Sequence, residues 1–403
     1  MGLTLRASEA GLLIVDAARK QRGWTKRAEI WCDKAEVRPT TLRRFWAGEK
    51  IKENNFINIC TAVGINNHES IASDNFLYIE RPAVETAAYQ CIMQPGSLLR
   101  IKGSKKMGKT ELLHWLFDCP AIEKYYKPYL NFMGVSQDAL DNVNMFLQWF
   151  CRKISEQLDI NPTIVDTSWN PELGSNDNCT AYLERVIFPK LNAPLAIFLD
   201  NVDEVFPYAH TATDFFRLLR SWHDDARILP GWNNLRLIIV HSTDIYLDLE
   251  VNHSPFNVGT CIELPDFSRN DVIELARRYN VALQTDQINQ LMAIIGGHPY
   301  LVTIALSTLR NNPELTLTTF LATAHTPAGH YYNDFLRKIE ALLMRHPTSV
   351  DLLRQILAAD HPILVDRDQG FRLRSLGLLR WHGDKAEPRC HLYRLYFQAC
   401  LSQ

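Results

Sequence analysis

The residues whose types and spacing carry chemistry most clearly lie between positions 98 and 113. An apolar β-type stretch, Leu98–Ile101, leads into Gly-x-x-x-x-Gly-Lys-Thr, and a helical pattern follows at once. In that order of strand, glycine loop and helix, backbone N–H groups converge on one anion and the helix N-terminus adds positive charge. The pattern predicts a phosphate-binding loop, with Lys109 on the β- and γ-phosphates and Thr110 on Mg²⁺. The candidate nucleotide-binding residues are Gly103, Ser104, Lys105, Lys106, Met107, Gly108, Lys109, Thr110 and Glu111. A surface loop that merely contains glycine and lysine is the alternative.

A second stretch, Leu195–Asp200, is a continuous apolar run that ends in a carboxylate. A buried parallel strand has this pattern, and ligands bind at the carboxyl ends of such strands. The pattern predicts that Asp200 lies beside the Mg²⁺ bound by Thr110. A strand followed by an acidic turn is the alternative. Together, the two stretches predict ATP or ADP with Mg²⁺ as ligands.

The residues after Asp200 bear on hydrolysis. Many ATPases with this pattern have a Glu directly after the Asp, whereas this chain has Asn201 and then Val202-Asp203-Glu204. An amide can position a water molecule but cannot accept its proton. We therefore expect slow ATP hydrolysis, with Asp200, Asn201 and Asp203 as the candidate catalytic residues. Asp203 and Glu204 are solvated in the alternative interpretation.

The elements that must position these residues indicate an α/β core. Strands are expected at 129–133, 235–240 and 260–264, and an amphipathic helix at 139–158, whereas polar residues 159–178 predict a surface excursion. Ser242 or Thr243 follows one strand, where a γ-phosphate sensor is expected. A helix ending at Pro95-Gly96 precedes the loop; Arg81 and Glu85 are weak adenine-site candidates there, and a structural linker is the favoured interpretation.

The first 75 residues read as helices. Ser8 is a candidate N-cap for 9–21, Thr25 for a second helix, and Pro39 fits the first turn of a third. A turn between the second and third helices indicates a helix-turn-helix, in which Thr40, Thr41, Arg43 and Arg44 form a face for DNA or a partner protein. This segment has 12 Lys or Arg against 9 Asp or Glu, a balance of +3. A solvated face is the alternative.

The C-terminal 77 residues contain helices at 331–345 and 350–359 and then a hairpin with Gly383-Asp384 as its turn. This order predicts a winged helix. Its arginines could contact DNA in a loader or initiator ATPase, and His391 could reach the phosphates, although a buried structural histidine is favoured. The arginines in question are Arg372, Arg374, Arg380, Arg389 and Arg394.

Composition narrows the class of protein. The 403 residues are 46% hydrophobic and 22% charged with a net charge of −2, which is typical of a folded protein and excludes a wholesale polyanion binder. The nine cysteines form no C-x-x-C pair, which favours a reduced, cytoplasmic protein over a zinc or disulfide framework. No signal peptide and no apolar run of about 18 residues is found, so no membrane span is expected.

Several stretches resemble the AAA-like ATPases of the STAND type (signal-transduction ATPases) found in cyanobacteria, and the resemblance covers the whole chain. The stretches are Leu3–Ser8, Thr41–Trp46, Asn55–Cys60, the phosphate loop, Gly297-His298-Pro299 and Cys390–Phe397. The resemblance implies that Pro299, in a Gly-x-Pro motif, packs against adenine. It also implies a role in signalling or antiviral defence and assembly into oligomers. Asn201 departs from the pattern.

The expected organisation is a P-loop NTPase core (76–266) between an N-terminal helix-turn-helix domain (1–75) and two C-terminal domains. These are a helical lid (267–326) and a winged helix (327–403). We expect an ATP-dependent molecular switch with weak ATPase activity. The alternative function is a DNA-binding loader or transposition regulator, and a small-molecule enzyme lacks any supporting residue constellation.

Overall fold

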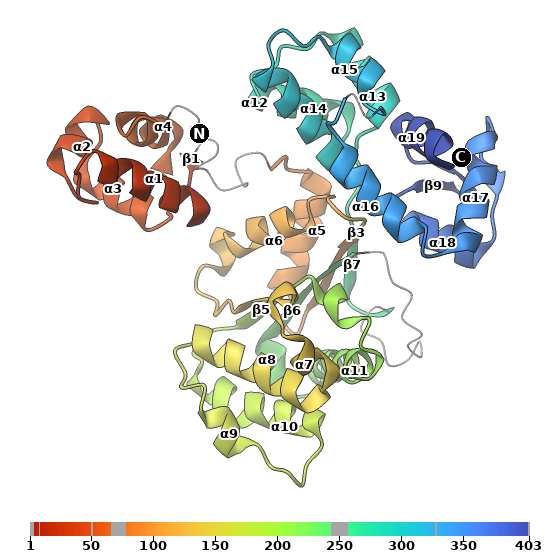
Figure 1. Cartoon of the computed structure of the whole chain (residues 1–403). Coiled ribbons are helices and arrows are strands. Elements are labelled where there is room, and N and C mark those ends of the chain that lie inside the picture. The colour runs from red at the N-terminus through yellow and green to blue at the C-terminus, as the bar shows by residue number, and fades with distance from the viewer. Residues whose placement is uncertain are drawn as a thin grey trace. The chain divides into compact units, whose positions relative to one another are not determined.

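The computed structural model describes residues 4–7, 9–49, 51–65, 78–242, 257–326 and 329–401 (Figure 1). The chain divides into two compact units, Met1–Tyr78 and Ile79–Gln403. Among the sequence predictions, Ser8, Thr243 and the start of the winged-helix segment at 327–328 lie outside the described residues. No helix in the described part is long and apolar enough to cross a membrane.

The N-terminal unit is helical and has its own core. Helices α1 (Glu9–Gln21), α2 (Glu29–Lys34), α3 (Pro39–Trp46) and α4 (Glu53–Ala62) surround the fully buried Trp31, Phe45 and Phe56. Strand β1 (Thr4–Leu5) pairs antiparallel with β2 (Ile51–Lys52). Pro39 is the first residue of α3, as predicted. The prediction for Thr25 is wrong: α2 begins at Glu29 with Ala28 as its N-cap, because residues 25–28 form a turn first.

The second unit is built on a parallel sheet, as the fold-class prediction requires. In the described residues its strand order is β4 (Tyr129–Asn131), β5 (Leu195–Asp200), β6 (Leu235–Ser242), β3 (Leu98–Gly103) and β7 (Thr260–Glu263). All residues of β5 and β6 are buried, which explains their continuous apolar runs. Strand β4 is shorter than predicted, because a 3₁₀ turn, Phe132–Gly134, replaces its end.

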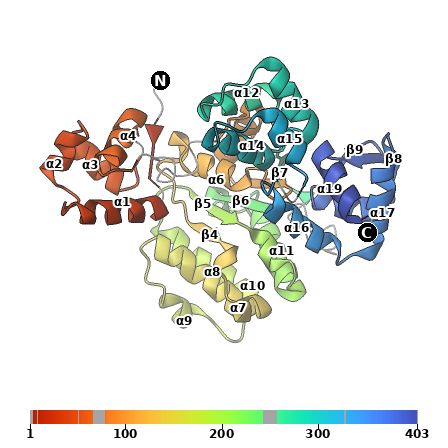
Figure 2. The same ribbon diagram turned by 45° about the horizontal axis from the view of Figure 1, so that its top comes forward.

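Helices cover both faces of this sheet (Figures 1 and 2). Alternate residues of β5, such as Ile197 and Leu199, join a core with α8 (Val143–Gln157), α10 (Ser175–Tyr182) and α11 (Ala209–Asp225). The opposite face meets α5 (Pro82–Met93) and α6 (Lys109–Phe117), where the Phe117 and Phe198 rings are 5.2 Å apart. Because successive side chains of a strand point to opposite faces of the sheet, each strand packs against the helices on both sides.

Two predictions in this core are wrong. The helix expected at 139–158 is broken into α7 (Gln137–Asp141) and α8, because the Asn142 side chain caps α8 by accepting a hydrogen bond from the backbone N–H of Met145. The expected surface excursion at 159–178 instead contains α9 (Ile164–Ser168) and the start of α10. Within that range Val165 is fully buried, and Ile160 and Asn178 are 6% and 3% exposed.

Helices α12 (Arg269–Arg278), α13 (Thr285–Ile295), α14 (Pro299–Asn311) and α15 (Leu317–Thr323) follow the sheet. The last segment contains α16 (Asn333–Leu343), α17 (Pro347–Ala358), α18 (Arg367–Ser375) and α19 (His391–Leu401). Its strands β8 (Ile363–Leu364), β9 (Leu379–His382) and β10 (Lys385–Pro388) form a sheet in the order β8-β10-β9. The predicted hairpin turn at Gly383-Asp384 joins β9 to β10.

Candidate functional site

The phosphate loop joins β3 to α6 at the carboxyl edge of the sheet. Gly108 has φ +91° and is the N-cap of α6, and Lys106 also has a positive φ of 66°. This backbone turns the loop sharply before the helix, where only glycine adopts φ > 0 without strain. The Lys109 ammonium donates to the backbone oxygens of Gly103 and Ser104, both at 2.9 Å. Glu111 lies in the first turn of α6.

Asp200 lies at the end of β5, next to the phosphate loop. Its Oδ2 accepts hydrogen bonds from the Thr110 hydroxyl at 3.2 Å and the Tyr129 hydroxyl at 2.9 Å, and its Oδ1 accepts from the backbone N–H of Asn201 at 2.9 Å. Only 1% of Asp200 is exposed, and burial raises its pKa, although these hydrogen bonds act in the opposite direction.

This donor set fits a magnesium ion. Mg²⁺ prefers oxygen ligands, and the Thr110 hydroxyl and the Asp200 carboxylate lie together. The carboxylate is buried with neutral partners, so a cation beside it would compensate the cost of burial. Tyr129 was not singled out from the sequence. Its position two residues before the end of β4 becomes informative only once β4 is known to pair with β5.

Asn201 and Asp203 are held by hydrogen bonds. Asn201 has φ 56°, and its Nδ2 donates to Asn131 Oδ1 at 3.1 Å, so its own Oδ1 faces away from that bond. The Oδ1 of Asp203 accepts the backbone N–H of Ser242 at 3.0 Å. Asp203 therefore ties the end of β6 to the turn after β5 and is not simply solvated, whereas Glu204 is exposed.

The segment before the first strand is part of the core, so its interpretation as a structural linker is wrong. Arg81 and Glu85 are 6% and 5% exposed. The Arg81 guanidinium donates to the backbone oxygens of Met107 at 3.4 Å and Pro265 at 3.3 Å. Arg81 therefore lies against the phosphate loop because α5 packs on β3 and β7.

Pro299 is buried at the first position of α14, and the preceding His298 is its N-cap. The backbone oxygen of Gly297 accepts a hydrogen bond from Phe267 at 2.7 Å, which ties this break to the chain after β7. A Cβ at Gly297 would lie 2.0 Å from the Phe267 oxygen, so only glycine fits there. The Gly-His-Pro motif is thus fixed close to the carboxyl edge of the sheet.

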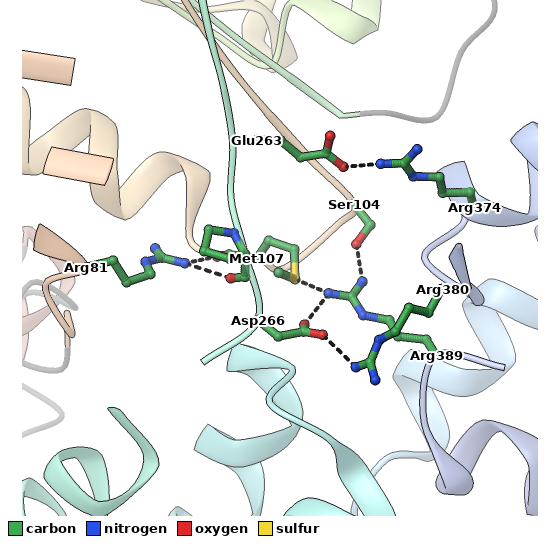
Figure 3. A network of polar contacts seen from close by, with 9 residues as sticks. Arg81, Ser104, Met107, Glu263, Asp266, Arg374, Arg380 and Arg389 are labelled. Atoms are coloured by element: carbon green, nitrogen blue, oxygen red, sulfur yellow. Dashed lines mark hydrogen bonds and ion pairs between the residues drawn. The ribbon is translucent and has the colours of Figure 1, made fainter. Parts of the chain in front are cut away.

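The sequence did not single out the residue that links the β9–β10 hairpin to the phosphate loop (Figure 3). Arg389, just after β10, donates from Nη1 to the Ser104 hydroxyl at 2.7 Å and from Nη2 to Met107 Sδ at 2.9 Å. It also forms an ion pair with Asp266, which pairs with Arg380 at 3.2 Å. We call Ser104, Asp266, Arg380 and Arg389 the latch. In sequence, Arg389 was one of five arginines considered for DNA contact, with nothing local to separate it.

The other four arginines of the C-terminal segment are mostly engaged within the protein. Arg374 pairs with Glu263 at 2.9 Å, and Arg394 donates to the backbone oxygens of Leu357 and Ala359. Among the five, Arg372 is exposed. The favoured interpretation of His391 as a buried residue is wrong, because it is exposed at the first position of α19.

In the N-terminal unit, α3 presents the predicted face. Thr40, Arg43 and Arg44 are exposed and Thr41 is half-buried, while Leu42 and Phe45 are buried behind them. Arg44 pairs with Glu49 at 2.8 Å. This exposed ion pair contributes little stability, and Arg43 and Arg44 remain accessible to a partner.

Comparisons with known proteins agree with this architecture. A Walker-type ATPase of Pyrococcus abyssi is 11% identical with a TM-score of 0.56, covering 80% of this chain and 96% of that one, and shows a shared fold. Two other likenesses are weaker. One is a STAND protein with a tetratricopeptide repeat sensor from Pyrococcus horikoshii (TM-score 0.35, 16% identity, 80% and 42% coverage). The other is the Aeropyrum pernix ORC2 protein in ADPNP–ADP complexes (TM-score 0.44, 14% identity, 81% and 95% coverage).

No curated protein matches the sequence. A family model described as "AAA-like domain" matches residues 66–399, which is most of the chain. That span includes the phosphate loop, Asp200 and the two arginines of the latch, Arg380 and Arg389. The chain therefore belongs to the AAA-like domain family.

Proposed function

We propose that this chain is an ATP-binding molecular switch in which bound nucleotide changes the contact between the phosphate loop and the winged helix. The observation that carries this proposal is the hydrogen bond from Arg389 to the Ser104 hydroxyl, within the loop itself. A phosphate group in the loop competes with Ser104 and Asp266 for the same guanidinium. The position of the winged helix then depends on what the loop holds.

In this proposal the phosphate loop and the end of β5 bind the nucleotide. Lys109 would exchange its two backbone acceptors for phosphate oxygens, and Thr110 and Asp200 would hold Mg²⁺. When bound, Mg²⁺ neutralises phosphate charge. Pro299 would pack against the base, and Arg81, buried between the loop and Pro265, would lie near it. Tyr129 orients the Asp200 carboxylate through its hydroxyl.

Hydrolysis is proposed to be slow, as befits a switch. Asn201 would hold the attacking water through Oδ1, because its Nδ2 is bonded to Asn131. An amide does not remove a proton, and Asp203 is occupied by the Ser242 N–H. The nucleotide state would therefore persist long enough to set the position of the winged helix.

Limited proteolysis with ADP, ATP or no nucleotide tests the switch. Only a ligand with different affinities for two conformations can shift their populations, so the three patterns should differ. Pro299→Ala should weaken ADP binding and make the patterns more alike. The exposed Asn311, at the end of the same helix, gives Asn311→Ala as a control that should leave them unchanged. Identical wild-type patterns in all three conditions would leave a constitutive scaffold as the better description.

A second candidate function is a DNA-binding loader or regulator. The exposed Thr40, Arg43 and Arg44 on α3, with Thr41 beside them, favour it, whereas the engagement of Arg374, Arg380 and Arg389 within the protein weighs against DNA contact through the winged helix. Affinity for duplex DNA measured against salt concentration separates the two, since phosphate contacts give a steep negative slope. Arg43→Ala with Arg44→Ala should abolish binding through this face, to DNA or protein, and leave ATP affinity intact.

The setting proposed for the switch is the cytoplasm, where thiols stay reduced, and the structure contains nine free cysteines. Signalling or antiviral defence would use the N-terminal unit as the arm that engages a partner. Assembly into a homo-oligomer in the ATP state would amplify the response. Sedimentation with ATP and with ADP would reveal such assembly as a change in mass.

A further inference from the structure

A cavity of about 340 Å³ lies between the phosphate loop and α16. We call it the α16 cavity. Its floor is apolar, from Phe335, Ile339 and Leu342, which share one face of α16 at helical spacing. Phe335 and Ile339 are only 9% and 7% exposed. The α16 cavity therefore has an apolar floor whose side chains are packed into the protein.

The rim of the α16 cavity is cationic. Lys105 and Lys106 extend from the phosphate loop, and Lys338 and Arg345 from the other side; all four are exposed. Among the described residues that line the cavity, none is acidic. Lys106 lies 5.6 Å from the centre of the Tyr300 ring, but in the described part of the chain none of the four forms an ion pair. The arginines of the latch differ from these four cations, because Arg380 and Arg389 both form ion pairs with Asp266.

His298 adds a buried polar group to the lining. Its side chain is 2% exposed and packs on Phe335, with ring centres 5.7 Å apart. Its Nδ1 has no hydrogen-bond partner among the described residues. Burial lowers the pKa of His298 to about 3, and the nearby Arg389 acts in the same direction, so the ring is neutral at pH 7. An unsatisfied buried nitrogen beside a cavity is costly unless a ligand or water pairs with it.

We propose that the α16 cavity binds a small organic anion with an apolar body, such as an aromatic ring or acyl chain carrying a phosphate, sulfonate or carboxylate. The apolar body lies on Phe335, Ile339 and Leu342, and the anionic group meets the cationic rim. The site is separate from nucleotide binding at Lys109. A ligand held there touches both the phosphate loop and α16, so it ties the two together. This role rests on the proposed switch function, of which such a ligand would be an effector.

The probe is 8-anilinonaphthalene-1-sulfonate, an aromatic sulfonate whose fluorescence rises in apolar surroundings, titrated into the full-length chain. One saturable site is expected. Lys338→Glu with Arg345→Glu should weaken binding at least about tenfold, because two attractive charges become repulsive at a partly desolvated site. Lys124→Glu with Arg227→Glu makes the same change of charge at exposed positions that do not line the cavity, and should alter affinity less than about twofold.

Two further variants keep the test decisive. Ala341→Trp, at an exposed lining position, narrows the cavity without removing a charge and should also weaken binding at least about tenfold. Lys109→Ala should keep the probe site while losing ATP, which separates this proposal from the nucleotide proposal. Binding that is equal in wild type, the double charge reversal and Ala341→Trp overturns the α16 site. Competitive displacement of the probe by ATP would show that the two sites overlap. It would overturn the proposal that the α16 cavity is separate from the nucleotide site.

Discussion

Two groups of polar residues meet at the carboxyl edge of the sheet, and they differ in how the chain brings them together. Lys109, Thr110 and Asp200 come from one loop and one strand of the same core. The latch joins that loop to Arg389, 285 residues later than Ser104. The first group is suited to binding a nucleotide. The second group, the latch, links the phosphate loop to the C-terminal segment. A response of that segment to bound nucleotide would need such a link.

The two carboxylates of these groups, the buried Asp200 and the half-buried Asp266, have opposite electrostatics. Burial raises the pKa of Asp200 by more than its hydrogen bonds from hydroxyl and amide groups, and the nearby His114, lower it. Burial also acts to raise the pKa of Asp266, but Arg389 and Arg380 beside it lower the pKa below its usual value. Asp266 therefore has its counter-charge within the protein, whereas no ion pair to Asp200 is found among the described residues. A buried carboxylate such as Asp200, held by neutral hydrogen-bond donors, is suited to binding a metal ion. A carboxylate paired with arginines, such as Asp266, stabilises the fold.

The sharpest way to test this division is Lys109→Ala, which should weaken ATP binding by about 10²–10³-fold because it removes a charge-assisted contact to phosphate. Lys124→Ala is the control, an exposed lysine outside the phosphate loop, and should change ATP affinity less than about threefold. Calorimetric titration measures both. A folded Lys109→Ala protein with wild-type ATP affinity would remove the nucleotide site from this loop.

Asn201→Glu should raise the rate of hydrolysis about 10–100-fold, since a general base contributes typically 10²–10⁴-fold and a Glu at φ 56° costs part of that gain. Asn201→Gln gives a side chain of the same length as Glu but without a base, so it should not raise the rate of hydrolysis. Steady-state phosphate release compares the three proteins. A wild-type rate near the common enzyme value of about 10 s⁻¹ would contradict slow turnover.

Arg389→Ala should free the winged helix and make it about tenfold more sensitive to limited proteolysis without nucleotide, because the Ser104 and Asp266 contacts are lost together. Arg372→Ala removes an exposed arginine of the same segment and is the control. Equal cleavage rates in the two variants would mean that the latch does not hold the C-terminal segment against the phosphate loop.

The smallest effect expected concerns pH and Asp266. Since its pKa in the native state lies below the unfolded value of about 3.9, its ion pairs stabilise the fold above that pH and are lost as the pH falls through the lower native pKa. Asp266→Asn should cost about 1 kcal/mol at pH 7 and at pH 5, and the difference should shrink below about pH 4. Urea unfolding at these pH values measures it. A difference that grows on acidification would reverse the sign of the argument.

Much of the site could be predicted from the sequence because its determinants are local. The glycines at 103 and 108 are adjacent to the strand and helix that they join, so the loop at Lys109 and Thr110 is a property of one short segment. The apolar run of β5 reflects burial on both faces, and it places Asp200 at the edge. The turn at Gly383-Asp384 is equally local. In each case the neighbours in sequence are the physical cause.

Other features were decided only by the tertiary structure. The polar composition of 159–178 conceals Ile160 and Val165, whose burial depends on the core that they join with residues of α8 and α11. The partner of Arg389 depends on how the hairpin meets the phosphate loop, and no local pattern separates it from the exposed Arg372. His298 lines a cavity only because α16 lies opposite the loop. Side-chain partners distant in sequence are set by the packing of whole elements, and a linear pattern does not record that packing.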